Sequence, residues 1–161
     1  MKPSIFNLEE KRLAKEIKRR GSKLVLIQLP EGLKPQGPKL AEVVERTGAV
    51  AIISADPCYG ACDVAEEEAQ NLKADLLVHF GHSQIRQAAR RGRVPTIYIE
   101  AEARLSLEAA LSKALPFIKS WKRIGLVTTI QHVKHLDEAK EILQAAGRSV
   151  AVGNAGRSSC A

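Results

Sequence analysis

The chain has 161 residues, enough for one ordinary domain or for one domain and part of another. Hydrophobic residues make up 45% of it, yet no stretch approaches the ~18 consecutive apolar residues that a transmembrane helix needs. The three cysteines are an odd number, and the N-terminus lacks the apolar core of a signal peptide. These features argue against a disulfide-stabilised secreted protein, and we expect a cytoplasmic one.

The formal net charge of +7 favours an anionic partner. Much of this excess lies on the faces of predicted amphipathic helices, as over residues 11–20, and is more simply a solvated surface. No basic motif with interleaved aromatic residues is present, so direct nucleic-acid binding is not predicted. A local basic cluster is either a solvated face or a docking site for an anionic partner; it comprises Arg86, Arg90, Arg91 and Arg93.

Short apolar strands alternate with helices along the chain. Such alternation predicts an α/β fold, in which helices cover both faces of a parallel sheet. The predicted elements are a helix capped by Asn7 and ended by Gly21, a strand at 24–29, a helix at 38–47, a strand at 49–54, a helix at 64–72 capped by Asp63, a strand at 76–80, a short helix at 84–91, a strand at 95–99, a helix at 106–119 interrupted by Pro116, a strand at 124–128, a helix at 132–146 and a strand at 149–152.

The order of elements starts again near residue 103. The strand at 24–29 and its loop Pro30-Glu31-Gly32 are matched by the strand at 124–128 and its loop 129–131. We interpret this as a weak internal repeat. It predicts a complete α/β domain over residues 1–102 and the first half of a second, similar domain over 103–161.

Unusual residues follow four of the predicted strands. Because the carboxyl ends of parallel strands meet at one edge of a sheet, residues far apart in sequence can share one crevice there. The four loops are Pro30-Glu31-Gly32, Cys58–Asp63, Gly81-His82-Ser83 and residues 128–132.

Two cysteines lie in the loop that follows the strand at 49–54. A thiol in such a place can be a metal or iron–sulfur ligand, a nucleophile or a redox group. The spacing of Cys58 and Cys62 is not that of zinc ribbons or thioredoxins, so a metal site would need ligands from elsewhere, and both could instead be small buried residues. Cys160 is either a further ligand or a terminal bystander.

The histidines divide into two groups. His82 and His132 follow strands and are either ligand-binding residues or loop-capping ones, whereas His79 is predicted to be a satisfied core residue and His135 a solvated helix residue. Gly81 permits a close backbone approach, and Ser83 with nearby amide groups suits a carboxylate or phosphate. Glu31 could bind a substrate amine or simply form a turn. The chain has no nucleophile elbow, phosphate-binding P-loop or dinucleotide motif.

Together these loops resemble one family, the archaeal-type diphthamide synthase or 2-(3-amino-3-carboxypropyl)histidine synthase. The resemblance is carried, in order, by Leu29–Leu33, Asp56–Asp63, residues 79–83 and residues 128–132, and it covers nearly the whole chain. Its most specific parts are Tyr59-Gly60-Ala61-Cys62 and Thr129-Ile130-Gln131-His132.

The resemblance implies a radical S-adenosylmethionine enzyme of the cytoplasm that works as a homodimer. Three related α/β domains each give one cysteine to a 4Fe–4S cluster, and the open iron position binds S-adenosylmethionine. Cleavage of the sulfur–Cγ bond releases a 3-amino-3-carboxypropyl radical, which adds to a histidine of translation elongation factor 2. This is the first step of diphthamide biosynthesis.

The resemblance also implies roles for residues of this chain. Cys62 matches the first cluster ligand, Cys58 is the second choice, and Cys160 stands at the approach to the second ligand's loop. The chain would cover the first domain and half of the middle one, so a three-point cluster is not expected to assemble on it alone. The residues expected to line the S-adenosylmethionine pocket are Glu31, Gly32, Gly81, His82, Ser83, Thr129, Gln131 and His132.

Two other functions remain open on the residues alone. One is a non-catalytic α/β binding module in which the cysteines are structural. The other is a different α/β enzyme that binds a small anion at Gly81-His82-Ser83.

Overall fold

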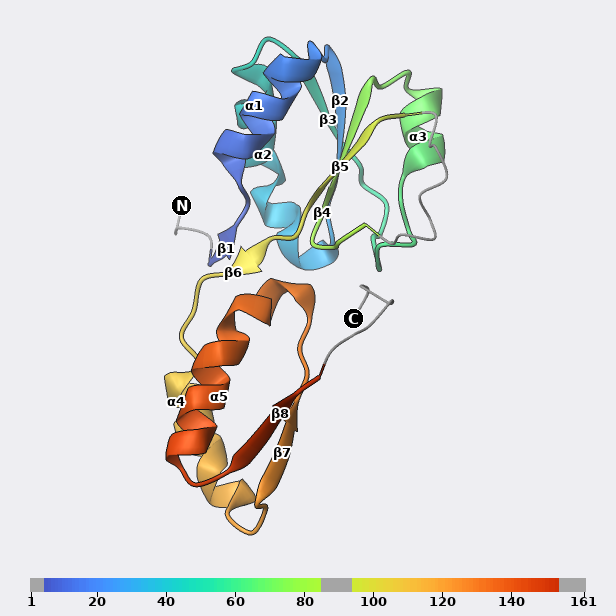
Figure 1. Cartoon of the computed structure of the whole chain (residues 1–161). Helices are drawn as coiled ribbons and strands as arrows, with labels where there is room; N and C mark the ends of the chain where they lie inside the picture. Colours follow the sequence, from blue (N-terminus) through green and yellow to red (C-terminus); the bar gives the residue numbers. More distant parts are fainter. Residues whose placement is uncertain (1–4, 85–93, 154–161) are drawn as a thin grey trace.

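A computed structural model of the chain, which describes residues 5–84 and 94–153, contains two parallel sheets (Figure 1). The larger sheet has the strand order β3-β2-β4-β5, and all neighbouring strands in it are parallel. Its strands are β2 (Leu24–Gln28), β3 (Val50–Ile53), β4 (Leu76–Phe80) and β5 (Thr96–Ile99). The smaller sheet pairs β7 (Arg123–Leu126) with β8 (Ser149–Val152). The predicted α/β class is confirmed.

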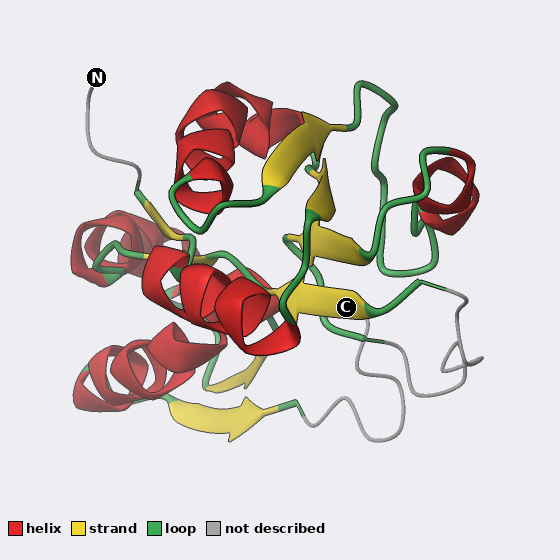
Figure 2. Ribbon diagram, turned by 90° about the horizontal axis from the view of Figure 1, so that it is seen from above, coloured by secondary structure: helices red, strands yellow, loops and turns green. Residues whose placement is uncertain are grey.

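Helices cover both faces of the larger sheet (Figures 1 and 2). Helices α1 (Glu10–Arg20) and α2 (Gly37–Glu45) pack on one face, and α3 (Glu66–Asn71) packs on the other. Because successive strand residues point to opposite faces, Val25 and Ile27 join the core beneath α1 and α2, whereas Leu26 packs with Ala69 of α3. The two central strands, β2 and β4, are therefore buried on both sides.

The first helix begins differently from the prediction. Its first residue is Glu10, and Asn7 does not cap it: Asn7 belongs to a two-residue strand, β1 (Phe6–Asn7), which pairs antiparallel with β6 (Glu102–Ala103). The Asn7 side chain accepts a hydrogen bond from Arg104 at 3.0 Å, a distant partner that no local pattern reveals. The end of α1 is as predicted, since Gly21 adopts φ 67°, which favours glycine.

Several predicted helices are divided or shortened. A 3-10 turn, η1 (Glu31–Gln36), precedes α2, and a similar turn, η4 (Ile130–His135), precedes α5 (Leu136–Ala145). The predicted interruption at Pro116 is confirmed, because α4 (Glu108–Ala114) gives way to the 3-10 turn η3 (Leu115–Ile118). Helix α3 starts at Glu66 without the Asp63 cap.

The restart of the element order is visible in the backbone. Hydrogen bonds and strand pairings of the first part recur 99 positions later in the second. The pairing of Leu24 with Val50 recurs as that of Arg123 with Ser149. The hydrogen bond from Leu33 N to Pro30 O recurs as that from His132 N to Thr129 O. The hydrogen bond from Ser54 N to Ile27 O recurs as that from Gly153 N to Leu126 O. The domain boundary near residue 103 stays a prediction.

The carboxyl ends of the two sheets face one another in Figure 1. The turn η4 joins them, because Gln131 Nε2 donates to the Gly81 carbonyl oxygen and Lys134 forms an ion pair of 2.6 Å with Glu102. His135 Nε2 donates to the Ala103 carbonyl oxygen at 2.8 Å. The prediction of a solvated His135 is wrong, because this side chain is a half-buried part of the junction.

Some expectations concern residues beyond the described ranges. They are the helix at 84–91 past its first residue, the four arginines at 86–93 and Cys160. Within the described ranges, none of the helices is long and apolar enough to cross a bilayer.

Candidate functional site

The cysteine loop follows β3 and presents its two thiols in different environments. Cys58 is buried, with 5% of its surface exposed, whereas Cys62 is exposed. Asp63 closes the loop: its carboxylate accepts a hydrogen bond from Tyr59 N at 3.0 Å, and its own amide donates to Gly60 O at 3.0 Å. This use of the Asp63 carboxylate explains why it does not cap α3.

Gln28, the last residue of β2, fixes the position of this loop. Its side chain is buried, and its Nε2 donates to Asp63 O at 2.7 Å while its Oε1 accepts from Ala65 N at 3.0 Å. A carbonyl oxygen can only accept and an amide N–H can only donate, so these two backbone groups define which end of the Gln28 amide is oxygen.

The orientation of Gln28 in turn defines the protonation of two histidines. His79 Nδ1 lies 2.7 Å from Gln28 Oε1 and must therefore donate to it, which leaves Nε2 as an acceptor. His82 Nδ1 lies 3.0 Å from that Nε2 and donates to it in turn. The neutral His82 ring consequently carries its remaining lone pair on Nε2.

Burial keeps this group of side chains uncharged. Desolvation, assisted by the neighbouring His82, lowers the pKa of His79 to about 4. Desolvation also lowers the pKa of His82, while burial and then Asp63 raise the pKa of Cys58. At neutral pH the site therefore holds two neutral imidazoles and a protonated thiol, and Cys58 is not an activated nucleophile.

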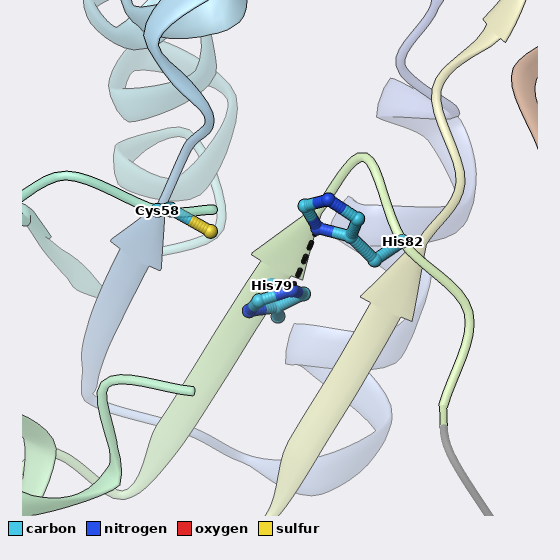
Figure 3. Close-up of side chains that lie close together, drawn as sticks. All are labelled: Cys58, His79 and His82. Atoms are coloured by element: carbon cyan, nitrogen blue, oxygen red, sulfur yellow. Dashed lines mark hydrogen bonds between the residues drawn. The ribbon is translucent and has the colours of Figure 1, made fainter. Parts of the chain in front are cut away.

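Cys58, His79 and His82 lie close enough to share one metal ion (Figure 3). One donor atom from each falls within 4.8 Å of the donor atoms of the other two. The cysteine loop supplies the sulfur, β4 supplies His79, and the turn after β4 supplies His82. The sequence predicted His79 to be a core residue with its hydrogen bonds satisfied, and it is fully buried. It also belongs to this group of possible metal ligands, which the sequence did not predict.

Gly81 lies where the turn after β4 passes closest to its neighbours. It adopts φ 85°, and a Cβ atom there would lie 2.7 Å from Pro30 Cγ, so only glycine fits without displacement. Its carbonyl oxygen accepts the hydrogen bond from Gln131. The loops after β2 and β4, two strands of the larger sheet, thus meet at Gly81, and the loop after β7 reaches it from the smaller sheet.

The other residues predicted to line the pocket each have surroundings of their own. Ser83 donates to Glu100 Oε1, Glu31 is exposed and ion-paired with Lys34, and Gly32 and Thr129 are exposed. His132 is half-buried, and its Nδ1 is buried with no hydrogen-bond partner among the described residues. His132 Nδ1 is thus available for a ligand.

A cavity of about 480 Å³ lies beside the cysteine loop, on the side of α3. Sequence analysis missed both this cavity and Gln28. The available signal for Gln28 was a polar residue at the end of an otherwise apolar, buried strand. Residues that line the cavity include Gln28, Asp56, Asp63, Glu67 and Glu68.

The comparisons with known proteins agree on one family. The family described as "Putative diphthamide synthesis protein" matches residues 29–160. The chain is 38% identical to the 2-(3-amino-3-carboxypropyl)histidine synthase of Pyrococcus horikoshii over 92% of its length and 43% of that protein. It is 32% identical to subunit 1 of the same synthase from Gallus gallus, over 88% of the chain and 35% of that protein.

Solved structures give the same result. The crystal structure of Dph2 from Pyrococcus horikoshii matches 90% of this chain and 42% of its own, with a TM-score of 0.79 and 38% identity. The structure of that protein with a 4Fe–4S cluster matches 89% of this chain and 42% of its own, with a TM-score of 0.78 and 39% identity. The chain thus spans less than half the length of these relatives. On the match of the family to residues 29–160, the chain belongs to the diphthamide synthesis protein family.

Proposed function

We propose that this chain forms part of an enzyme for the first step of diphthamide biosynthesis. The enzyme transfers the 3-amino-3-carboxypropyl group of S-adenosylmethionine to a histidine of translation elongation factor 2, as a cytoplasmic homodimer. The proposal rests on family membership and on relatives named as 2-(3-amino-3-carboxypropyl)histidine synthases. One domain over residues 1–102 and part of a second over 103–161 would belong to the longer enzyme.

The exposed thiol of Cys62 is the observation that carries this proposal. It stands at the carboxyl edge of the sheet, on the loop after β3, where a ligand of the crevice must lie. A thiolate is the ligand that iron–sulfur clusters require, and an exposed one can reach a cluster shared with other segments. The residues present therefore fit one corner of a 4Fe–4S cluster.

The bound cluster supplies the electron for radical cleavage of the sulfur–Cγ bond of S-adenosylmethionine. The protein's own residues bind and orient that substrate. His132 Nδ1, buried and without a partner among the described residues, offers a hydrogen bond to it. His82, Ser83 and Thr129 add polar groups, while Gly81 and Gln131 hold the loops together. Glu31 and Gly32, on the loop after β2, would complete the pocket.

Removal of the Cys62 thiol tests the proposal. The full-length gene product that contains these residues is reconstituted anaerobically with iron and sulfide, and its iron content and visible absorbance are measured. We expect Cys62→Ala to lose the cluster absorbance and the transfer activity, because one corner of the cluster loses its ligand. Cys58→Ala is the matched control, four residues away in the same loop, and we expect it to retain iron.

Two results would contradict the proposal. One is a Cys62→Ala protein that keeps its iron and its absorbance. The other is a wild-type protein that folds normally and binds no iron, which would favour a non-catalytic binding module.

A further inference from the structure

We propose that Cys58, His79 and His82 bind a single divalent cation of the zinc type, at a site separate from the iron ligand assigned to Cys62. The loop after β3 supplies Cys58, β4 supplies His79, and the turn after β4 supplies His82 (Figure 3). Two imidazoles and one thiolate are the ligands that select zinc over magnesium or calcium, which prefer oxygen ligands.

The distances are close to those of a zinc site. Zinc–nitrogen bonds of about 2.0–2.1 Å in a tetrahedral site place two nitrogen ligands about 3.3 Å apart. His79 Nε2 and His82 Nδ1 are 3.0 Å apart, and the donor atoms of all three residues lie within 4.8 Å of one another. A zinc–sulfur bond of about 2.3 Å places the sulfur about 3.5 Å from each nitrogen, so a closer approach of the donor atoms by about 1 Å brings them to bonding distance.

The hydrogen bonds around His79 prepare it for metal binding. A metal-bound histidine usually donates its second ring N–H to an oxygen acceptor, which fixes the tautomer and the orientation of the ring. His79 Nδ1 donates in this way to Gln28 Oε1 at 2.7 Å, and Gln28 is itself held by Asp63 O and Ala65 N. The bare Nε2 of His79 consequently points toward His82, where the cation would bind.

Binding exchanges protons for the metal. Cys58 releases its thiol proton to solvent as the sulfur coordinates, because the ligand is the thiolate. The hydrogen bond between His82 and His79 is replaced by two metal–nitrogen bonds: His79 binds through its free Nε2, and the His82 ring changes tautomer, giving its Nδ1 proton to solvent and taking one up at Nε2, so that Nδ1 can coordinate. Three protein ligands leave a fourth position for water or a substrate atom, and His82 is only half-buried, so solvent can reach this side.

The two cysteines of the loop are suited to different groups. Cys58 is buried against the histidines and can reach a single ion there, but a cluster of four irons and four sulfides would have to displace them. Cys62 is exposed and free of that restriction. The zinc-type site therefore uses no ligand of the proposed cluster, although it shares His82 with the proposed S-adenosylmethionine pocket.

A titration with Co²⁺ tests this site on the 161-residue chain itself. The reduced chain is freed of metal with a chelator and titrated with Co²⁺ in the absence of iron and sulfide. We expect one equivalent to bind with a thiolate-to-cobalt charge-transfer band, and Zn²⁺ to displace it. Cys58→Ser should lose this band, and His79→Gln and His82→Gln should weaken Co²⁺ affinity by roughly 10–100-fold or more.

Cys62→Ser is the matched control and should keep both the band and the affinity. A wild-type chain without a charge-transfer band, or a band that survives Cys58→Ser or depends on Cys62, would overturn the site. Circular dichroism checks that each variant folds, and the half-buried His82 provides a test if Cys58→Ser fails to do so. Because the assay contains no iron or sulfide, a failure to bind Co²⁺ would not contradict the proposed cluster at Cys62. Likewise, a failure of the cluster test at Cys62 would not contradict the zinc-type site.

Discussion

The strand pairs β2–β3 and β7–β8 share a backbone arrangement but differ in what they bury. In each pair the strands are parallel, the first strand follows a helix, and a 3-10 turn and a second helix connect it to the second strand, with hydrogen bonds that recur 99 positions apart. In β2, however, the residues from Val25 to Gln28 are all buried, whereas the residues of β7 alternate between exposed and half-buried.

Neighbouring strands explain this difference. Strand β2 lies between β3 and β4, whereas within the described residues β7 pairs only with β8. The backbone arrangement is therefore set by local sequence, and the core depends on additional strands from elsewhere in the chain. The large apolar side chains Phe117 and Trp121 are accordingly exposed in the second region.

The polar residues at the ends of the strands differ between the two regions in the same way. Gln28 is buried at the end of β2, and the residue 99 positions later, Val127, is 85% exposed at the end of β7. A buried polar residue can fix a histidine tautomer and an amide orientation, because it has few alternative partners. The first region therefore carries a defined polar network, whereas the second contributes single contacts such as Gln131.

Truncation of equivalent strand residues should show the largest difference in stability between the two regions. Ile27 is fully buried in the larger core, and Leu126, 99 positions later, is half-buried. We expect Ile27→Ala to lower the free energy of unfolding by about 4 kcal/mol, and Leu126→Ala by about 1 kcal/mol, because the second site loses fewer contacts and can admit water. Urea unfolding measures both, and equal losses would contradict the comparison.

Acid should destabilise the first region through His79. Burial places its folded-state pKa at about 4, below the usual value of 6.5, so the unfolded chain binds a proton more readily. The stability it contributes is complete above pH 6.5, falls between pH 6.5 and about 4, and amounts to on the order of 3 kcal/mol.

Unfolding of the chain with a chelator present, measured from pH 7 to about pH 4, checks this dependence. His79→Gln removes the titrating ring, so its free energy of unfolding should change less over the same range. If the wild-type chain lost no more free energy of unfolding between pH 7 and about pH 4 than His79→Gln does, His79 would not be the group responsible for the acid sensitivity.

Local patterns were sufficient to predict most of the fold. Strands at 24–29, 49–54, 76–80 and 149–152 are all present within a residue or two, because their apolar runs are bounded by glycine, proline or charged residues. Gly21 ends its helix as expected. The convergence of parallel strand ends predicts that the loops after β2 and β4 meet, as they do at Gly81, but the loop after β7 comes from a second sheet and its contact with Gly81 does not follow from that argument.

Long-range pairings could not be predicted in this way. The two-residue strands β1 and β6 meet across nearly the whole first region. The Asn7 side chain accepts hydrogen bonds from Arg104 and from Glu9 N, and it caps no amide of the first turn of α1. His135 reaches the Ala103 carbonyl oxygen for a similar reason. The network of Gln28 depends on three backbone and side-chain partners that are 35 to 51 positions away, and no spacing rule connects them.

The smallest expected effect concerns the junction between the regions. Gln131 donates from η4 to the Gly81 carbonyl oxygen in a half-buried hydrogen bond, whereas Lys134 of the same turn forms an exposed ion pair with Glu102. We expect Gln131→Ala to lower the free energy of unfolding by about 1 kcal/mol, since the buried Gly81 oxygen loses its donor. Lys134→Ala should cost less, because solvent and salt screen an exposed ion pair. Urea unfolding of both variants at low and high salt measures the difference. If Lys134→Ala proved the more costly change, charge rather than the Gly81 hydrogen bond would hold the two sheet edges together.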